Sequence, residues 1–290
     1  MKKLTIAIIL AMISLGAEAQ AYYDIIVSSK AGTLKKMGSL KDWKEMKWVS
    51  ISGPVNEEDL YFLGWLTING NMEHLKLDEA TGIKYIPKRC FEPSLHVDST
   101  AKKDEKRQSK LLSMTLGQLM TEIRDSAFCD CKILERITLD DSLKRIDSYA
   151  FANCEKLKDI KHTDKIEELG EYAFFHCKSF RNEQLSLNLK RINRGCFMGC
   201  DSLGLVLLEE NIKEIEEYAF LNTNIEFVVC KADKAPACDG NVFDIKPEKG
   251  GMLRIRPGKK NEYRKKVGFS LLENVYEDIH LAKDYKPTKK

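Results

Sequence analysis

The stretch IDSYAFANC, residues 146–154, decides the fold, because the chain repeats its pattern at a fixed interval. The later copies are LGEYAFFHC at 169–177, INRGCFMGC at 192–200 and IEEYAFLNT at 215–223. Each copy begins 23 residues after the copy before it. A fixed period of about 20 to 50 residues, with several apolar positions in each copy, is the signature of a protein built from stacked repeats. The sequence therefore predicts a solenoid.

One phenylalanine marks the register of every copy, at Phe128, Phe151, Phe174, Phe197, Phe220 and Phe243. After each Phe comes a second apolar set, such as Leu134, Ile137 and Leu139, whose alternation is typical of a short strand. Residues 146–151 have helix-like apolar offsets, which predict a short helical or irregular turn. One such unit cannot bury its apolar face alone, whereas stacked units build one sheet and one continuous core. We therefore predict an α/β repeat solenoid of the leucine-rich-repeat type. It has coils of about 23 residues, one parallel sheet face and atypical N- and C-terminal caps.

The second residue after each Phe is small or polar, at Asp130, Asn153, His176, Gly199 and Asn222. Gly and Asn at a fixed position suit a turn or a left-handed backbone conformation. We therefore expect His176 to be a turn residue and not a metal ligand or a base.

Four segments are expected along the chain. Residues 1–19 have a positive start, an apolar run and an Ala-Glu-Ala site, which together indicate a signal peptide and hence export. Residues 20–71 are predicted to form an N-terminal capping region, and residues 72–230 the solenoid, with an exposed charged loop near 95–108. Residues 231–290 are predicted to contain an atypical C-terminal repeat, a cap and a tail. No other apolar run approaches the roughly 20 residues of a membrane span, so no membrane span is expected.

The phrase Ile-x3-Ala-Phe-x2-Cys followed by Leu-x2-Ile, as at residues 146–160, resembles the BspA-like leucine-rich repeats of exported bacterial proteins, especially from the Bacteroidetes. The flanking stretches 31–83 and 234–278 also resemble that group. The resemblance implies surface adhesion and the binding of host or neighbouring-cell macromolecules. This sequence departs from the pattern at His162 and Glu183, which take inward strand positions, and at Gly195-Cys196, which replaces Tyr-Ala. Local irregularity is expected there.

No catalytic motif is visible in the sequence, and the five histidines show no spacing typical of a metal site or a catalytic triad. We expect no catalytic residue, no cofactor and no metal, and the mixed charges do not favour nucleic acid as a partner. The predicted function is that of a non-enzymatic exported binding or adhesion protein, found at the cell surface, secreted or periplasmic, with a protein or glycan partner. The alternative is a glycan-processing accessory protein or an enzyme with an unrecognised site. A cluster of outward His, Asp and Ser on adjacent coils would favour that alternative, and the sequence pattern reveals none.

Two groups of residues are candidates for partner binding. The first is an apolar set at outward strand positions, Leu205, Leu207, Phe227 and Val229, which is either an exposed patch or a surface covered by the C-terminal segment. The second is a column of tyrosines one or two periods apart, Tyr149, Tyr172 and Tyr218, interrupted by Gly195. These tyrosines either cap the Phe column, which is the interpretation we favour, or contact a protein or a sugar.

Cysteines and charges also follow the period. Cys131, Cys154, Cys177 and Cys200 stack one per coil and are expected to be free buried thiols. If a disulfide forms, the expected pair is Cys230 with Cys238. The pairs Lys144-Arg145, Glu167-Glu168 and Lys190-Arg191 alternate in sign from coil to coil, and this alternation is predicted to set the register of the coils.

Overall fold

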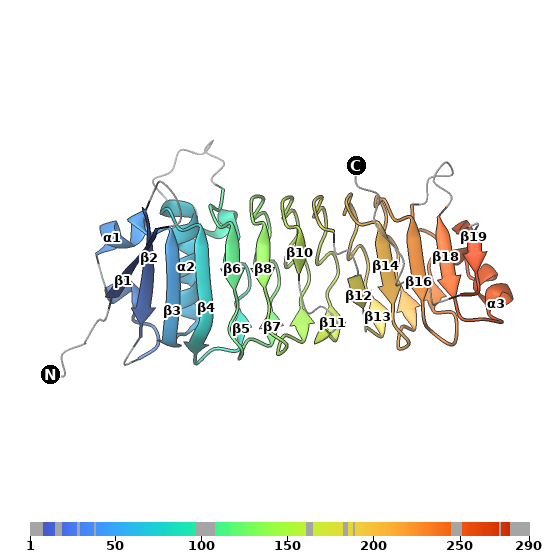
Figure 1. The fold of residues 1–290 in the computed structure, drawn as a ribbon, viewed down its shortest axis with the longest axis horizontal. Coiled ribbons are helices and arrows are strands. Elements are labelled where there is room, and N and C mark those ends of the chain that lie inside the picture. The colour runs from blue at the N-terminus through green and yellow to red at the C-terminus, as the bar shows by residue number, and fades with distance from the viewer. Residues whose placement is uncertain are drawn as a thin grey trace.

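The computed structural model describes residues 8–14, 19–27, 30–37, 39–96, 108–160, 165–181, 185–187, 189–244, 251–272 and 274–278. The molecule is an elongated stack of coils, with helices α1 and α2 at the N-terminal end and α3 at the other (Figure 1). The predicted solenoid of the leucine-rich-repeat type is confirmed. The limits proposed for the four segments stay predictions.

The predicted sheet lies along one side of the stack. It consists of a seven-stranded sheet, in the order β1-β2-β3-β4-β6-β8-β10, and a five-stranded sheet, in the order β12-β14-β16-β18-β19. All neighbouring pairs are parallel except β1 with β2. The strands are β1 (Ile8–Ser14), β2 (Ala19–Ile26), β3 (Trp48–Pro54), β4 (His74–Thr81), β6 (Ser113–Thr115), β8 (Arg136–Thr138), β10 (Asp159–Ile160), β12 (Leu185–Leu187), β14 (Leu205–Leu208), β16 (Phe227–Cys230), β18 (Met252–Ile255) and β19 (Asn274–Tyr276).

A second layer of short parallel strands runs along another side of each coil and was not predicted. It contains the orders β11-β9-β7-β5 and β13-β15-β17. These strands are β5 (Tyr85–Ile86), β7 (Glu122–Ile123), β9 (Arg145–Ile146), β11 (Glu168–Leu169), β13 (Arg191–Ile192), β15 (Glu214–Ile215) and β17 (Ala237–Cys238). The prediction of a helical or irregular turn over residues 146–151 was therefore wrong at its start. Ile146 ends a strand, and the residues that follow form hydrogen-bonded turns.

The core is a column of parallel phenylalanine rings. From Phe91 to Phe243, seven successive rings stack with centroids 5.0–5.5 Å apart and planes within 7° of one another. None of the seven is more than 4% exposed. The ring spacing is close to the separation of about 4.8 Å between strands, so each coil adds one ring to the same column.

The five turns from Phe128 to Phe220 each contain two residues with left-handed backbone. The predicted positions two after Phe have φ between 55° and 75° at Asp130, Asn153, His176, Gly199 and Asn222, which confirms the prediction. The positions two before Phe also have positive φ, at Arg89, Ser126, Tyr149, Tyr172, Gly195 and Tyr218. The two left-handed residues are four positions apart, one on each side of the Phe. Together they reverse the chain around the buried ring, so the turn needs no helix.

The N-terminal end of the stack is covered by short helices: η1 (Leu34–Lys36), α1 (Leu40–Glu45) and α2 (Glu57–Asn69). Helix α2 begins with a capping box between Asn56 and Asp59. The carboxylate of Asp59 also accepts hydrogen bonds from the backbone N–H groups of Gly32 and Leu34, at 2.5 and 2.9 Å. A single buried side chain therefore fixes both the start of α2 and the segment beside η1. The remaining helices are η2 (Pro93–His96), α3 (Lys260–Arg264) and η5 (Phe269–Leu271).

Of the predicted signal peptide, residues 8–14 form β1, and its role in export stays a prediction. The predicted loop near 95–108 begins in η2, and its residues 97–107 lie outside the described part of the chain.

Strand β12 lies out of the 23-residue frame. Leu185 pairs with Val206 and Leu187 with Leu208, whereas the frame places Glu183 beside Val206. A shift of two residues keeps the alternation of faces and brings a leucine beside fully buried Val206 in place of a glutamate. His162 and Glu183 themselves lie outside the described residues.

In the second layer, each short strand from β7 to β15 begins with a charged residue, followed by a buried Ile or Leu. The sign of this charge alternates from coil to coil, in the order Glu122, Arg145, Glu168, Arg191 and Glu214. The strand register sets Glu122 and Glu168 on either side of Arg145, and Arg191 beside Glu214. Ion pairs join Arg145 to Glu122 at 3.0 Å and Arg191 to Glu214 at 2.6 Å. At the preceding position, Lys144 pairs with Glu167 at 3.2 Å. The alternation predicted from the sequence therefore forms contacts between coils.

Candidate binding surfaces

The predicted apolar patch lies on the outer face of β14 and β16. Leu205, Leu207 and Val229 are 3%, 8% and 1% exposed, and Phe227 packs half-buried against them. They form a small cluster separate from the main core. The burial of these side chains does not fit an open patch, and coverage of this face by the C-terminal segment stays a prediction. Partner binding by these residues stays a prediction.

The tyrosine column is more accessible. Tyr149 and Tyr172 stack with ring centroids 5.1 Å apart and planes 13° apart. Tyr149 is 42% exposed, and Tyr172 and Tyr218 are half-buried. All three have positive φ, at 57°, 55° and 63°. For a bulky residue this backbone conformation costs on the order of 1–3 kcal/mol, and such strain is concentrated at functional sites. A role for the column in partner binding stays a prediction.

The coil after Tyr172 leaves room for its side chains. A Cβ atom built on Gly195 would overlap the ring of Tyr172, and one built on Gly199 would overlap the ring of His176. His176 in turn stacks on Phe175 with centroids 3.9 Å apart, and Phe175 meets Tyr172 edge-on at 5.7 Å. The replacement of Tyr-Ala by Gly195-Cys196 therefore makes space for an aromatic cluster, while the turn itself stays regular.

A histidine and a serine on neighbouring strands form a polar pair that the sequence analysis missed. His74 Nδ1 lies 2.7 Å from Ser113 Oγ, and the His74 ring stacks on Trp48 with centroids 3.5 Å apart. Burial lowers the pKa of His74, which favours the neutral imidazole. Within the described ranges, no carboxylate hydrogen-bonds to His74. The pair could have been found by aligning Leu75 with Met114, which the strand register places side by side. The intervening charged loop, which breaks the period, hid this alignment.

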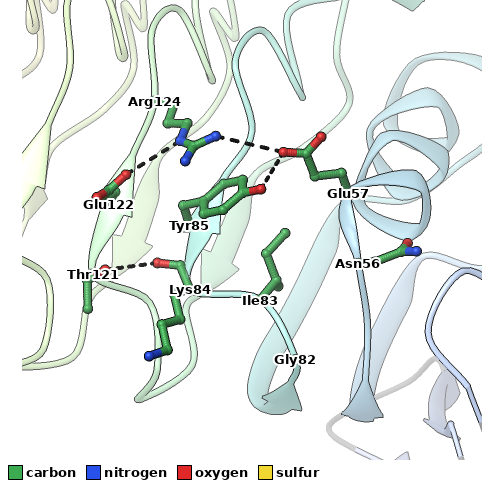
Figure 2. Close-up of a pocket in the computed structure, with 9 residues that line it drawn as sticks. All are labelled: Asn56, Glu57, Gly82, Ile83, Lys84, Tyr85, Thr121, Glu122 and Arg124. Carbon is green, nitrogen blue, oxygen red and sulfur yellow. Dashed lines mark hydrogen bonds and ion pairs between the residues drawn. The ribbon is translucent and has the colours of Figure 1, made fainter.

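A polar pocket of about 470 Å³ lies where the N-terminal cap meets the first coils (Figure 2). Nine residues line it: Asn56, Glu57, Gly82, Ile83, Lys84, Tyr85, Thr121, Glu122 and Arg124. The guanidinium carbon of Arg124 lies 3.4 Å from the centroid of the Tyr85 ring, and the hydroxyl of Tyr85 donates a 2.5 Å hydrogen bond to Glu57. Arg124 also faces Glu57 at 3.8 Å and Glu122 at 3.4 Å.

This network binds the cap to the solenoid. Glu57 belongs to the first turn of α2, Tyr85 to β5, and Arg124 directly follows β7. The hydrogen bond from Tyr85 to Glu57 is the main cause that raises the pKa of the Tyr85 hydroxyl, so the phenol stays a donor. The principal side chains of the pocket are thus engaged with one another, and the arrangement is that of a structural junction.

The cysteine column has a definite role in the stack. The thiols of Cys131, Cys154, Cys177 and Cys200 donate hydrogen bonds of 3.1–3.2 Å to the carbonyl oxygens of Phe91, Phe128, Phe151 and Phe174 in the preceding coils. Burial raises the pKa of each thiol, so the proton is retained. All nine cysteines lie within the described ranges and are free in the structure, including Cys230 and Cys238.

Neither a metal centre nor a spanning helix is found in the part of the chain that the structure describes. No group of three or more His, Cys, Asp or Glu side chains there could hold a metal ion. No helix among these residues is long and apolar enough to cross a membrane.

The fold and its turn chemistry define a leucine-rich-repeat solenoid whose coils carry Ala-Phe turns and a thiol column. Residues 121–243 match the family described as "BspA type Leucine rich repeat region", in six copies. The match covers 123 of the 290 residues, and over this region the chain consists of BspA-type leucine-rich repeats.

Three solved structures of bacterial proteins match most of this chain. The structure of the pneumococcal vaccine antigen PcpA is 13% identical, with a TM-score of 0.50, over 80% of this chain and 69% of that chain. A leucine rich cell surface protein from Faecalibacterium prausnitzii is 12% identical, with a TM-score of 0.34, over 95% and 88%. A leucine-rich repeat protein from Bacteroides ovatus is 14% identical, with a TM-score of 0.31, over 92% and 69%. No curated protein matches the sequence.

Proposed function

We propose that this chain is an exported, non-enzymatic binding or adhesion protein that presents its solenoid surface to a protein or glycan partner. The observation that carries the proposal is the Tyr149–Tyr172 pair, two stacked rings held by a rigid coil stack, the first of them open to solvent. Tyrosine offers a large amphipathic contact surface at low cost in conformational entropy. The BspA-type repeats of residues 121–243 fit this role, and the apolar segment within residues 1–19 supports export.

The test is a pull-down of candidate proteins and glycans with residues 20–290, comparing the native sequence with a Tyr149→Ala, Tyr172→Ala double variant. Loss of two aromatic contacts is expected to reduce retention of a partner about tenfold or more. Val267→Ala is a matched control, because Val267 is 64% exposed and lies far from the tyrosines in the C-terminal region. Equal retention of every partner by the double variant and the control would overturn the role of the column.

The His74–Ser113 pair is the observation that favours the alternative, an enzyme or a glycan-processing accessory protein. A serine beside a neutral imidazole is one part of a hydrolytic site. Such a site also needs an orienting group and oxyanion donors, and the described contacts of His74 supply neither. Hydrolysis of aryl esters and aryl glycosides that is lost on Ser113→Ala, with the fold unchanged, would establish the alternative and exclude the non-enzymatic proposal.

A further inference from the structure

A second cleft lies beside α2 in the N-terminal cap. It has a volume of about 420 Å³ and is formed by η1, α1, α2 and η2. This volume is within the range of roughly 300–1,000 Å³ that is usual for ligand sites. The consecutive residues Glu57 and Glu58 at the start of α2 line different cavities, Glu57 the polar pocket and Glu58 this cleft.

The walls of the cleft are aromatic and rigid. Tyr61, Phe62 and Trp65 come from one stretch of α2, and Leu40, 46% exposed, comes from the start of α1. The rings of Phe62 and Trp65 are nearly parallel, with centroids 6.5 Å apart. Trp43 meets Phe62 edge-on at 5.4 Å from behind and is itself buried. A ligand would therefore find the aromatic surface already in place.

Most polar groups around the cleft already have partners within the protein. Asp59 accepts the backbone hydrogen bonds that fix the segment beside η1. His96 Nε2 lies 2.6 Å from the carbonyl oxygen of Cys90, and the hydroxyl of Tyr61 donates to the carbonyl oxygen of Lys88 at 2.9 Å. A sugar ring needs several hydrogen-bonding partners for its hydroxyl groups, and these three side chains are engaged elsewhere. The cleft is therefore better suited to an apolar group.

Two charges of opposite sign stand at the rim. Lys35 and Glu58 are exposed, and within the described ranges the side chain of neither forms an ion pair or a hydrogen bond. Some other charges near the cap are paired, for example Lys47 with Glu73 at 3.2 Å and Arg89 with Glu92 at 2.5 Å. A partner that complements the rim carries an acidic group for Lys35 and a basic group for Glu58, next to the apolar group that enters the cleft.

We infer that this cleft binds a protein partner by a large apolar side chain, aromatic or aliphatic, in a segment with an acidic and a basic residue on either side of it. The side chain packs on Tyr61, Phe62 and Trp65, and the two flanking charges meet Lys35 and Glu58. The inference rests on the proposed binding function and narrows the partner at this site to a protein. If a glycan binds at Tyr149 and Tyr172, the inference about this cleft is unaffected.

The test uses short acetylated, amidated peptides as probes: Glu-Phe-Lys, Lys-Phe-Glu, and the same two with Ala in place of Phe. Methyl glycosides of common hexoses are the competing class. Binding to residues 20–290 is followed by ligand-observed NMR and by tryptophan fluorescence, because Trp65 lines the cleft. At least one Phe peptide is expected to bind about tenfold or more tightly than its Ala counterpart, because the Phe side chain leaves water on binding and the Ala side chain has little apolar surface to bury.

Variants test the walls and the rim of the cleft. Leu40→Ala and Trp65→Ala are expected to abolish or strongly weaken binding of the Phe peptide, and Leu40→Ala is the less disruptive of the two because Leu40 is 46% exposed. Lys35→Gln is expected to weaken binding at low salt and to have little effect at high salt. Val267→Ala is the control and should bind the peptide normally, because Val267 is 64% exposed and belongs neither to the cleft nor to the tyrosine column. Binding of glycosides in preference to peptides, equal binding of Phe and Ala peptides, or binding of no probe would overturn the inference, whatever the outcome at the tyrosines.

Discussion

Gly195→Ala is expected to destabilise the protein through the ring of Tyr172 as well as through the backbone. Gly195 has φ +59°, and the Cβ atom of an alanine there would overlap the Tyr172 ring, with Cζ at 3.0 Å and two other ring atoms still closer. The ring can move away only by leaving its stack with Tyr149.

The magnitude has two parts. A left-handed conformation costs an alanine roughly 1–2 kcal/mol relative to glycine. Loss of the Tyr149–Tyr172 stack adds about 0.5–1.5 kcal/mol. The substitution should therefore lower the free energy of unfolding by about 1.5–3.5 kcal/mol in total. In a Tyr172→Ala background the clash and the stack are both absent, so only the backbone part remains, and the coupling energy should be about 1 kcal/mol.

The assay is equilibrium urea unfolding of the native sequence, the two single variants and the double variant. Gly258→Ala is a matched control, because Gly258 has φ +79° but no atom lies within 4 Å of the position of its Cβ. It should show the backbone cost alone. If Gly195→Ala costs the same with and without the Tyr172 ring, and no more than Gly258→Ala, then the ring does not occupy the space above Gly195 and the reasoning is refuted.

Three further predictions concern the core, the thiols and the charges. Phe174→Ala should cost about 3–5 kcal/mol, because it opens a gap in the buried ring column, and a loss below about 1 kcal/mol in denaturant titration would contradict the assigned frame. Stability should fall above about pH 9, because the unfolded chain loses thiol protons that the buried thiols keep, by about 1.4 kcal/mol per pH unit for each such thiol. Cys154→Ala should make this slope shallower by that amount, and parallel unfolding-energy profiles for variant and native protein would show that Cys154 keeps an ordinary pKa. Glu167→Lys with Glu168→Lys should lower stability modestly, since the Lys144–Glu167 contact is exposed and worth about 0.2–1 kcal/mol. The loss should shrink in high salt, and equal losses at low and high salt would exclude a charge ladder between coils.

The repeat was predictable because every coil must bury the same apolar positions in the same column. Phe128, Phe151 and their equivalents are fixed by burial in a common column, and the left-handed turn after each Phe was visible in residues such as Asn153 and Gly199. The second strand layer was not predictable, because a two-residue strand such as Arg145–Ile146 is too short to show alternation. The left-handed tyrosines were missed for a different reason. Nothing in the residue type of Tyr149 favours positive φ, and the stacked turns around it determine that conformation.

The candidate sites were less predictable than the fold. Both clefts need residues of the cap, which has no repeat to align. Its contacts join residues distant in the sequence, such as Glu57 with Tyr85 and Arg124. The apolar set at Leu205 and Val229 was correctly placed on the outer face of the sheet, but whether that face is open depends on tertiary packing. Strand β12 shows a further limit, since the 23-residue frame cannot reveal a shift of two residues that keeps the same face inward.

The alternating charge column has a consequence for how such a chain can grow. The four coils that contain Cys131, Cys154, Cys177 and Cys200 offer their neighbours the same thiol donor, the same Phe carbonyl and the same ring, so a duplicated block of 23 residues from this region would continue these columns. The charges do not share this period. Glu122 and Glu168 are 46 residues apart, as are Arg145 and Arg191, so the charge pattern repeats only after two coils. Duplication of a single coil would place two like charges side by side, whereas duplication of a pair would preserve the alternation of charge. The natural unit of lengthening for this solenoid is therefore 46 residues.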